Sequence, residues 1–186
     1  MRRSHDRIIL GIDPGTNLMG YGVIFDNGKK PGYEEMGVVD LKKAGTHYMK
    51  LRKIYERTLG LLDRYLPDEV AIEAPFYGRN VQSMLKLGRA QGVAIAAVIS
   101  RDIPVFEYAP RKIKLSITSA GDASKEQVAG MLAHMFALKE IPSNLDATDG
   151  LAVAVCHYYQ KTSGAIRSRG NSSWEEYVRK NPGKVK

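Results

Sequence analysis

Residues 8–25 read IILGIDPGTNLMGYGVIF, and this stretch decides the fold. Its first five residues are typical of a strand buried on both faces, and the Pro-Gly pair that follows ends the strand in a turn. A second strand returns through residues 21–25. The first strand ends in a carboxylate, Asp13. Ionising an acid among such apolar residues costs on the order of several kcal/mol without a partner, so this position needs an explanation.

Three explanations of Asp13 remain open from this stretch alone. The side chain can cap the following turn, as Asp commonly does. It can instead bind a metal ion. The pattern Gly11-x-Asp13-x-Gly15-Thr16 also resembles the phosphate-binding hairpin of actin-like ATPases and sugar kinases. That function requires a second, similar domain, for which we expect 186 residues to leave no room.

Length and charge predict one domain followed by a basic tail. A chain of 186 residues can bury a core without disulfides, and its single cysteine, Cys156, suits a reducing, cytoplasmic compartment. The net charge is +8, but residues 161–186 alone carry seven Lys or Arg against two Glu. We expect a globular domain over residues 1–160 and a flexible basic tail over residues 161–186 that contacts phosphates non-specifically. No stretch reads as a signal peptide or a transmembrane helix, so we expect no membrane association.

The spacing of apolar residues predicts how the next elements are connected. A tight-turn signal leads into a third strand over residues 33–41, so the first three strands form an antiparallel meander. Apolar positions over residues 45–65 recur at helical spacing, and residues 70–73 form a short strand after this helix. A right-handed crossover places that strand parallel to the first, on the side away from the second. Glu73, at its end, is then expected beside Asp13.

The second half of the chain is predicted to complete an α/β fold. The expected elements are a helix over residues 81–100, a strand over residues 104–108, and helices that begin near Pro110, Ser124 and Asp146. The first of these helices is apolar almost all round in its second half, which indicates burial under the sheet and against another subunit. The prediction is a five-stranded mixed sheet, with antiparallel strands one to three, parallel strands four and five, and helices on both faces.

Asp146 and Asp149 stand three residues apart, on one face of the first turn of the last helix. Acids are common at helix starts, but the apolar residues that follow are expected to press this helix, and both acids, against the sheet. Together with Asp13 and Glu73 they form a predicted cluster of four carboxylates. One or two divalent cations stabilise four such anions at once, and oxygen ligands favour Mg²⁺ or Mn²⁺ over zinc. Two ions about 4 Å apart support phosphodiester hydrolysis.

Aromatic and basic side chains stand close to these acids in the sequence. The candidate residues for contacts with a polyanionic partner are Phe76, Tyr77, Arg79, Asn80, Arg111, Lys114 and Lys125. The first four follow Glu73, and they fit either ordinary core packing or a stacking platform beside a phosphate. Arg111 and Lys114 belong to a basic cluster that fits a solvated face equally well. Lys125 opposes a helix dipole, which fits a phosphate contact or a solvated lysine.

Several separated motifs between Ile8 and Tyr159 carry a family resemblance. They are GIDPGT with GYGV, AIEAPF followed by N-x-x-S-x-x-K-L-G-x-A-x-G-V-A, PVFEYAPRKIK, SKEQV and DATDGLAVA. With these motifs the chain resembles the RuvC family of Holliday junction resolvases, which are crossover junction endodeoxyribonucleases of RNase H-like fold. The resemblance implies that the four acids are catalytic and bind two Mg²⁺, which Mn²⁺ can replace. It also implies that Phe76 contacts unpaired bases and that Lys114 and Lys125 contact DNA.

The same resemblance implies a biological setting. Members of this family act as homodimers in the bacterial cytoplasm, nick two strands of a four-way DNA junction symmetrically, and work with the RuvA–RuvB branch-migration complex in DNA recombination and repair. Two alternatives remain from the sequence. The chain can be a branched-DNA binding protein that does not cut, although the presence of all four acids argues against this. It can also be a general RNase H-like nuclease, which a linear duplex substrate distinguishes from a resolvase.

Overall fold

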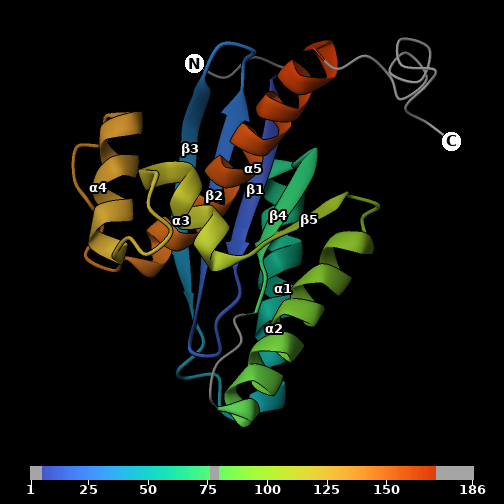
Figure 1. The fold of residues 1–186 in the computed structure, drawn as a ribbon. Helices are drawn as coiled ribbons and strands as arrows, with labels where there is room; N and C mark the ends of the chain where they lie inside the picture. Colours follow the sequence, from blue (N-terminus) through green and yellow to red (C-terminus); the bar gives the residue numbers. More distant parts are fainter. Residues whose placement is uncertain (1–5, 76–79, 171–186) are drawn as a thin grey trace, which may run out of the picture.

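The chain folds into one mixed sheet with helices on both faces. The computed structural model describes residues 6–75 and 80–170, with side chains through residue 161. The elements are β1 (Arg7–Asp13), β2 (Leu18–Asp26), β3 (Pro31–Asp40), α1 (His47–Tyr65), β4 (Glu69–Glu73), α2 (Val81–Ile99), β5 (Val105–Tyr108), α3 (Pro110–Thr118), α4 (Lys125–Phe136) and α5 (Asp146–Gly170). Helices α1 and α2 cover one face of the sheet, and α3, α4 and α5 cover the other (Figure 1).

Strand β1 lies at the centre of the sheet, as the sequence predicts. The strand order is β3-β2-β1-β4-β5, with β2 antiparallel to β1 and β4 parallel to it. Strand β5 runs parallel to β4, and β3 runs antiparallel to β2. These pairings confirm both the meander and the crossover. They also confirm the predicted sheet of three antiparallel and two further parallel strands.

The two faces of β1 serve two separate cores. Leu10 and Ile12 are fully buried in the core shared with α1 and α2. Ile9 points to the other face and is fully buried in the core formed with α3, α4 and α5. A Cβ atom at Gly11 would lie 2.2 Å from the carbonyl oxygen of Gly150, so the backbone of α5 rests directly on this strand. The continuous apolar run of β1 is therefore explained by burial on both sides.

Local signals fix most of the helix ends. The side chain of Ser124 accepts a hydrogen bond from the backbone N–H of Gln127, and the Gln127 side chain accepts one from the backbone N–H of Ser124. This reciprocal pair is the predicted capping box at the start of α4. Thr46 caps α1 through its side chain, and Pro110 opens α3. Within the described residues, no helix combines the length and apolarity needed to cross a membrane.

Helix α5 extends further than the sequence indicates. It runs to Gly170, so the boundary expected after residue 160 falls inside a helix. The Ser, Gly and Arg residues of this segment favoured a tail, but they follow fifteen helical residues on which further turns can propagate. The rest of the expected tail, residues 171–186, lies outside the described residues.

Candidate active site

Two neighbouring parallel strands bring Asp13 and Glu73 to the same edge of the sheet. The last residues paired between β1 and β4 are Ile12 and Ile72. Asp13 and Glu73 each follow that pair by one residue, so the two carboxylates occupy equivalent positions on adjacent strands. Both are half-buried. Glu73 pairs with a residue of β5 in the same register, which fixes its backbone from the other side.

The first turn of α5 comes to this edge because small residues allow a close approach. A Cβ atom at Gly150 would lie 2.4 Å from the Cα atom of Tyr21 on β2. A Cβ atom at Gly20 would lie 2.0 Å from the backbone oxygen of Asp146. A larger residue at either position would push the helix off the sheet. Glycine therefore places Asp146 and Asp149 over the strands next to Asp13.

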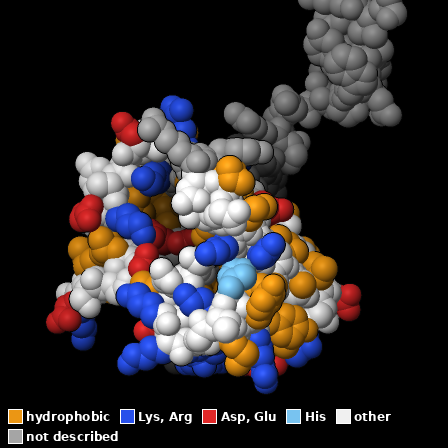
Figure 2. Space-filling model, turned by 90° about the horizontal axis from the view of Figure 1, so that it is seen from below, with side chains coloured by type: hydrophobic (Ala, Val, Ile, Leu, Met, Phe, Trp, Pro, Cys, Tyr) orange, Lys and Arg blue, Asp and Glu red, His pale blue; other side chains and the backbone are white. Residues whose placement is uncertain are grey.

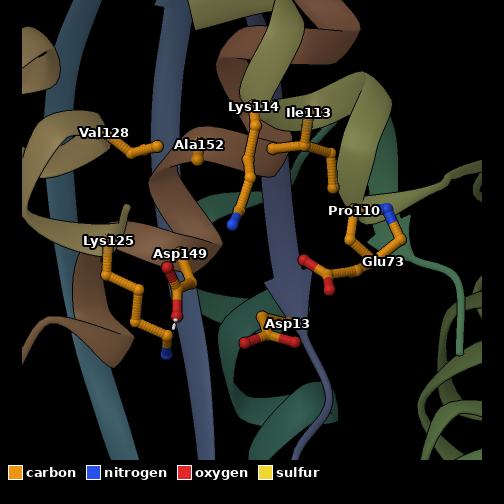
Figure 3. Close-up of a pocket in the computed structure, with 9 residues that line it drawn as sticks. All are labelled: Asp13, Glu73, Pro110, Ile113, Lys114, Lys125, Val128, Asp149 and Ala152. Carbon is orange, nitrogen blue, oxygen red and sulfur yellow. Dashed lines mark hydrogen bonds and ion pairs between the residues drawn. The ribbon is translucent and has the colours of Figure 1, made fainter. Parts of the chain in front are cut away.

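Three of the four acids line one cavity. Asp13, Glu73 and Asp149 face a space of about 140 Å³, together with Lys114 and Lys125. Figure 3 shows Asp13 between the other two carboxylates, with Lys114 pointing toward the space that they surround. The three acids come from β1, β4 and α5, which are far apart in sequence. The fold thus converts three separated segments into one anionic pocket.

Lys125 connects the fourth acid to this group. Its Nζ atom lies 2.9 Å from Oδ1 of Asp146 and 2.5 Å from Oδ2 of Asp149. Burial lowers the pKa of Lys125, but the hydrogen bonds to Asp149 and Asp146 outweigh it and raise this pKa above its usual value. The sequence alone leaves Lys125 as either a phosphate contact or a solvated lysine. In the structure its charge is directed at the two acids of α5.

The acids repel one another. Burial, reinforced by the charges of Asp149 and Asp146 and opposed by Lys125, raises the pKa of Asp13 to about 7. Burial, together with the charges of Asp13 and Asp149, raises the pKa of Glu73 to about 8. Burial also raises the pKa of Asp149, although Lys125 opposes this. The two lysines of the pocket therefore do not offset the negative charge of the acids, and the site favours the binding of a further cation.

The donor set fits a hard divalent cation. The four side chains offer carboxylate oxygens and no sulfur or nitrogen, which is the preference of Mg²⁺ and Mn²⁺. Across the described residues, no three His, Cys, Asp or Glu side chains already converge as a ligand group. Asp146 and Asp149 bind the ammonium of Lys125 instead. Lys125 contacts one oxygen of each of these carboxylates, Oδ1 of Asp146 and Oδ2 of Asp149.

The other predicted contacts are distributed around the pocket. Arg111 and Lys114 line a wider cavity of about 850 Å³ that also includes Glu73. Figure 2 shows Lys and Arg side chains around a hollow that holds acidic side chains. Asn80 caps α2, since its Oδ1 atom accepts a hydrogen bond from the backbone N–H of Ser83 at 3.1 Å. Phe76, Tyr77 and Arg79 lie outside the described residues.

Sequence reasoning missed Gln91. Its buried amide nitrogen donates to Oε2 of Glu107 at 2.7 Å and to the backbone oxygen of Glu73 at 3.3 Å. Gln91 thereby ties α2 to the ends of β4 and β5. The available signal is a single amide side chain in the Ala- and Gly-rich second half of this helix, which is apolar almost all round.

The sheet order, the crossover and the carboxylates at the edge define an RNase H-like nuclease fold. The family model for crossover junction endodeoxyribonuclease RuvC matches residues 9–157. The chain belongs to the RuvC family, whose members are metal-dependent nucleases of DNA recombination and repair.

Relatives and solved structures agree with this membership. The chain is 58% identical over 183 residues to crossover junction endodeoxyribonuclease RuvC of Bacteroides fragilis, which covers 97% of both chains. A second RuvC, from Porphyromonas gingivalis, is 54% identical over 97% of this chain and 98% of its own length. The structure of Thermus thermophilus RuvC in complex with a Holliday junction substrate matches with a TM-score of 0.78 at 31% identity, over 85% of this chain and 96% of that one.

Proposed function

We propose that the chain resolves four-way DNA junctions by paired, symmetric, metal-dependent hydrolysis, with Asp13, Glu73, Asp146 and Asp149 as its catalytic and metal-binding residues. The observation that carries the proposal is the anionic pocket. Carboxylates from β1, β4 and α5 line one cavity, and burial raises the pKa of each of them. Their negative charges are therefore costly there unless a cation or protons offset them. Membership of a resolvase family that is matched over nearly the whole chain supplies the substrate class.

Each acid has a defined place in the proposed reaction. Asp13 lies between the other carboxylates of the pocket and would help to hold the cations together with them. Glu73 would contribute a ligand from β4, and Asp146 and Asp149 would contribute ligands from α5. Two Mg²⁺ ions, which Mn²⁺ can replace, would supply an activated water and stabilise the leaving 3′ oxygen. The rigid strands and the helix keep the carboxylates in position, so the chain needs no histidine base or covalent nucleophile.

The basic residues contribute to the binding of DNA. Lys114 is half-buried and points into the space between the acids, where it can hold a phosphate next to the cut. Without a bound cation, the ammonium of Lys125 offsets part of the negative charge of the two acids of α5. Arg111 lies along the wider cavity and reaches the backbone further from the cut. Phe76, Tyr77, Arg79 and Asn80 follow Glu73 in the sequence and complete the proposed junction contacts.

Cutting both strands requires two sites, so the proposed active form is a homodimer. Helix α2 supports this because it leaves large apolar side chains exposed. Val81, Leu85 and Ile99 are 63%, 51% and 58% exposed, and a second copy of the chain can bury them. The family resemblance adds the RuvA–RuvB complex as a partner and the bacterial cytoplasm as the location. The basic tail is proposed to add non-specific phosphate contacts.

A cleavage assay on matched substrates tests the proposal. A synthetic four-way junction and a linear duplex of the same sequence are incubated with the protein and Mg²⁺. Paired nicks at symmetric positions in the junction, with an intact duplex, support a resolvase. Cutting of both substrates would identify a general RNase H-like nuclease, and binding without cutting would identify a branched-DNA binding protein.

A further inference from the structure

Four cavities follow one another along the edge of the sheet on which the acids lie, and each shares at least one lining residue with the next. The wide cavity that Arg111 lines shares the residue Lys114 with the anionic pocket. That pocket shares Asp13 with a third cavity of about 220 Å³, and the third shares Leu87 with a fourth of about 390 Å³. We call these four adjoining cavities the trough. The acids lie near its middle, with Lys114 and Arg111 on one side.

The fourth cavity forms the opposite end of the trough, and its lining suits an anion. Three segments meet there, namely the turn after β1, the start of α1 and the first two turns of α2. They contribute Thr16, Asn17, His47, Lys50, Ser83 and Lys86. No acidic side chain of the described residues lines this cavity. Hydroxyl, amide and ammonium groups are the donors that proteins use for phosphate oxygens.

Lys50 is held at this cavity by two hydrogen bonds, and Lys86 is placed there by its position on α2. The Nζ atom of Lys50 donates to the backbone oxygen of Thr16 at 3.1 Å and to Oδ1 of Asn17 at 2.9 Å. An ammonium has three donors, so one remains for a ligand. Lys86 is exposed and stands one helical turn after Ser83, beside the amino end of α2. The partial positive charge of that helix end adds to the same field.

We propose that this end of the trough is a phosphate-binding subsite for the DNA strand that is cut, with Lys86 and Lys50 as its charged contacts. The strand then runs along the trough with its scissile phosphate at the acids. Lys114 holds a phosphate on one side of the cut, and Lys86 holds one on the other. Two such contacts fix the direction in which the strand crosses the pocket. This inference rests on the proposed function and adds a subsite to it.

A salt titration tests whether Lys86 neutralises a phosphate. Lys86→Ala and Lys30→Ala are compared for binding to a four-way junction, each in a chain that also carries Asp13→Asn so that strands stay intact. Lys30 is an exposed lysine in the turn between β2 and β3, at the other end of the sheet, and serves as the control. Lys86→Ala should weaken binding roughly tenfold at low salt and lower the salt slope by about 0.9. Lys86→Arg should restore both values.

A second measurement locates the contact. Junctions with one neutral methylphosphonate at successive positions around the mapped cut are bound by the Lys86→Ala and Lys114→Ala variants. Each substitution should lose its effect when its own phosphate is already neutral, and the two positions should fall on opposite sides of the cut. Positions on the same side, or a Lys86→Ala slope equal to that of Lys30→Ala, would overturn the subsite. Failure of the unsubstituted chain to cut any junction would instead overturn the proposed function, and the salt titration, which needs no cleavage, would still test the subsite.

Discussion

The ammonium of Lys125 lies 2.5 Å from Oδ2 of Asp149, although the two residues stand at the starts of different helices. The same ammonium also binds Asp146. The packing of α4 beside α5 therefore places a positive charge where the proposed cations must act. A cation held by these two carboxylates would be repelled by the ammonium, which already binds one oxygen of each.

Removing that ammonium should strengthen the binding of divalent cations. Lys125→Met keeps the length of the side chain and removes its charge. We expect the dissociation constant for Mn²⁺ at pH 8, measured by calorimetry without DNA, to fall about fivefold. This is equivalent to about 1 kcal/mol, a modest value because the side chain is half exposed. Lys139→Met, in the exposed segment after α4, is the control for net charge. Unchanged or weaker binding by Lys125→Met would show that the ammonium does not compete.

The stability of the metal-free protein should fall as pH rises from 4 to 8. Folding raises the pKa of Asp13 from 3.8 to about 7 and that of Glu73 from 4.5 to about 8. Between the unfolded and folded values, the folded state holds protons that the unfolded state has released, so each increase in pH favours unfolding. The loss attributable to these acids is on the order of a few kcal/mol.

Urea denaturation at several pH values measures this loss. Asp13→Asn removes one titrating acid and relieves the repulsion on Glu73, so its free energy of unfolding should depend less steeply on pH than that of the unsubstituted chain. The difference between the two curves is the relevant quantity, because groups elsewhere affect both. Parallel curves would contradict the pKa shifts. Added Mg²⁺ should stabilise the unsubstituted chain most at the alkaline end.

A methyl group at Gly150 should damage both stability and cleavage. Its Cβ atom would lie 2.4 Å from backbone atoms of Tyr21, so α5 must move away from β2 and take Asp149 with it. We expect Gly150→Ala to cost roughly 3 kcal/mol and to reduce cleavage further than the unfolded fraction explains. Gly60→Ala is the matched control, because this exposed glycine of α1 has no atom within 4 Å of the added Cβ. It should gain about 0.5–1 kcal/mol and keep its activity. Equal behaviour of the two variants would refute the close packing.

Loss of the Gln91 amide should affect cleavage more than binding. Gln91→Leu removes the amide that donates to Oε2 of Glu107 and to the backbone oxygen of Glu73. We expect a loss of about 1–3 kcal/mol in stability and a slower single-turnover cleavage rate with unchanged junction affinity, because Glu73 is less firmly held. Gln82→Leu, on the exposed part of the same helix, should change neither rate nor affinity. A purely structural role would leave the rate of the folded fraction unaltered.

The sequence predicts the sheet and the edge at which the acids meet because strong local patterns specify them. The apolar run before Asp13 is typical of a strand buried on both faces, and the helical spacing after β3 indicates a crossover that places β4 beside β1. The capping box of Ser124 marks the start of α4 in the same way. Each of these signals is contained in one continuous segment of the chain, so reading it needs no knowledge of tertiary packing.

The remaining features depend on contacts between distant segments. The sequence leaves Lys125 as a phosphate contact or a solvated side chain, because only the packing of α4 beside α5 brings it to Asp149. The role of Gln91 requires the carboxyl ends of β4 and β5 to meet α2. The end of α5 at Gly170 was missed because the composition after Lys161 favours a tail. Amino-acid composition does not reveal that a well-packed helix can extend by further turns.

The most direct test of the central claim compares the unsubstituted chain with Asp13→Asn on a four-way junction in Mg²⁺, with binding and cutting measured together. Both proteins should bind the junction, since asparagine preserves the shape of the side chain. Only the unsubstituted chain should release paired, symmetric nicks, and Asp13→Asn should be slower by at least about a hundredfold. Cleavage by Asp13→Asn at the rate of the unsubstituted chain would contradict the assignment of the four acids as the catalytic site.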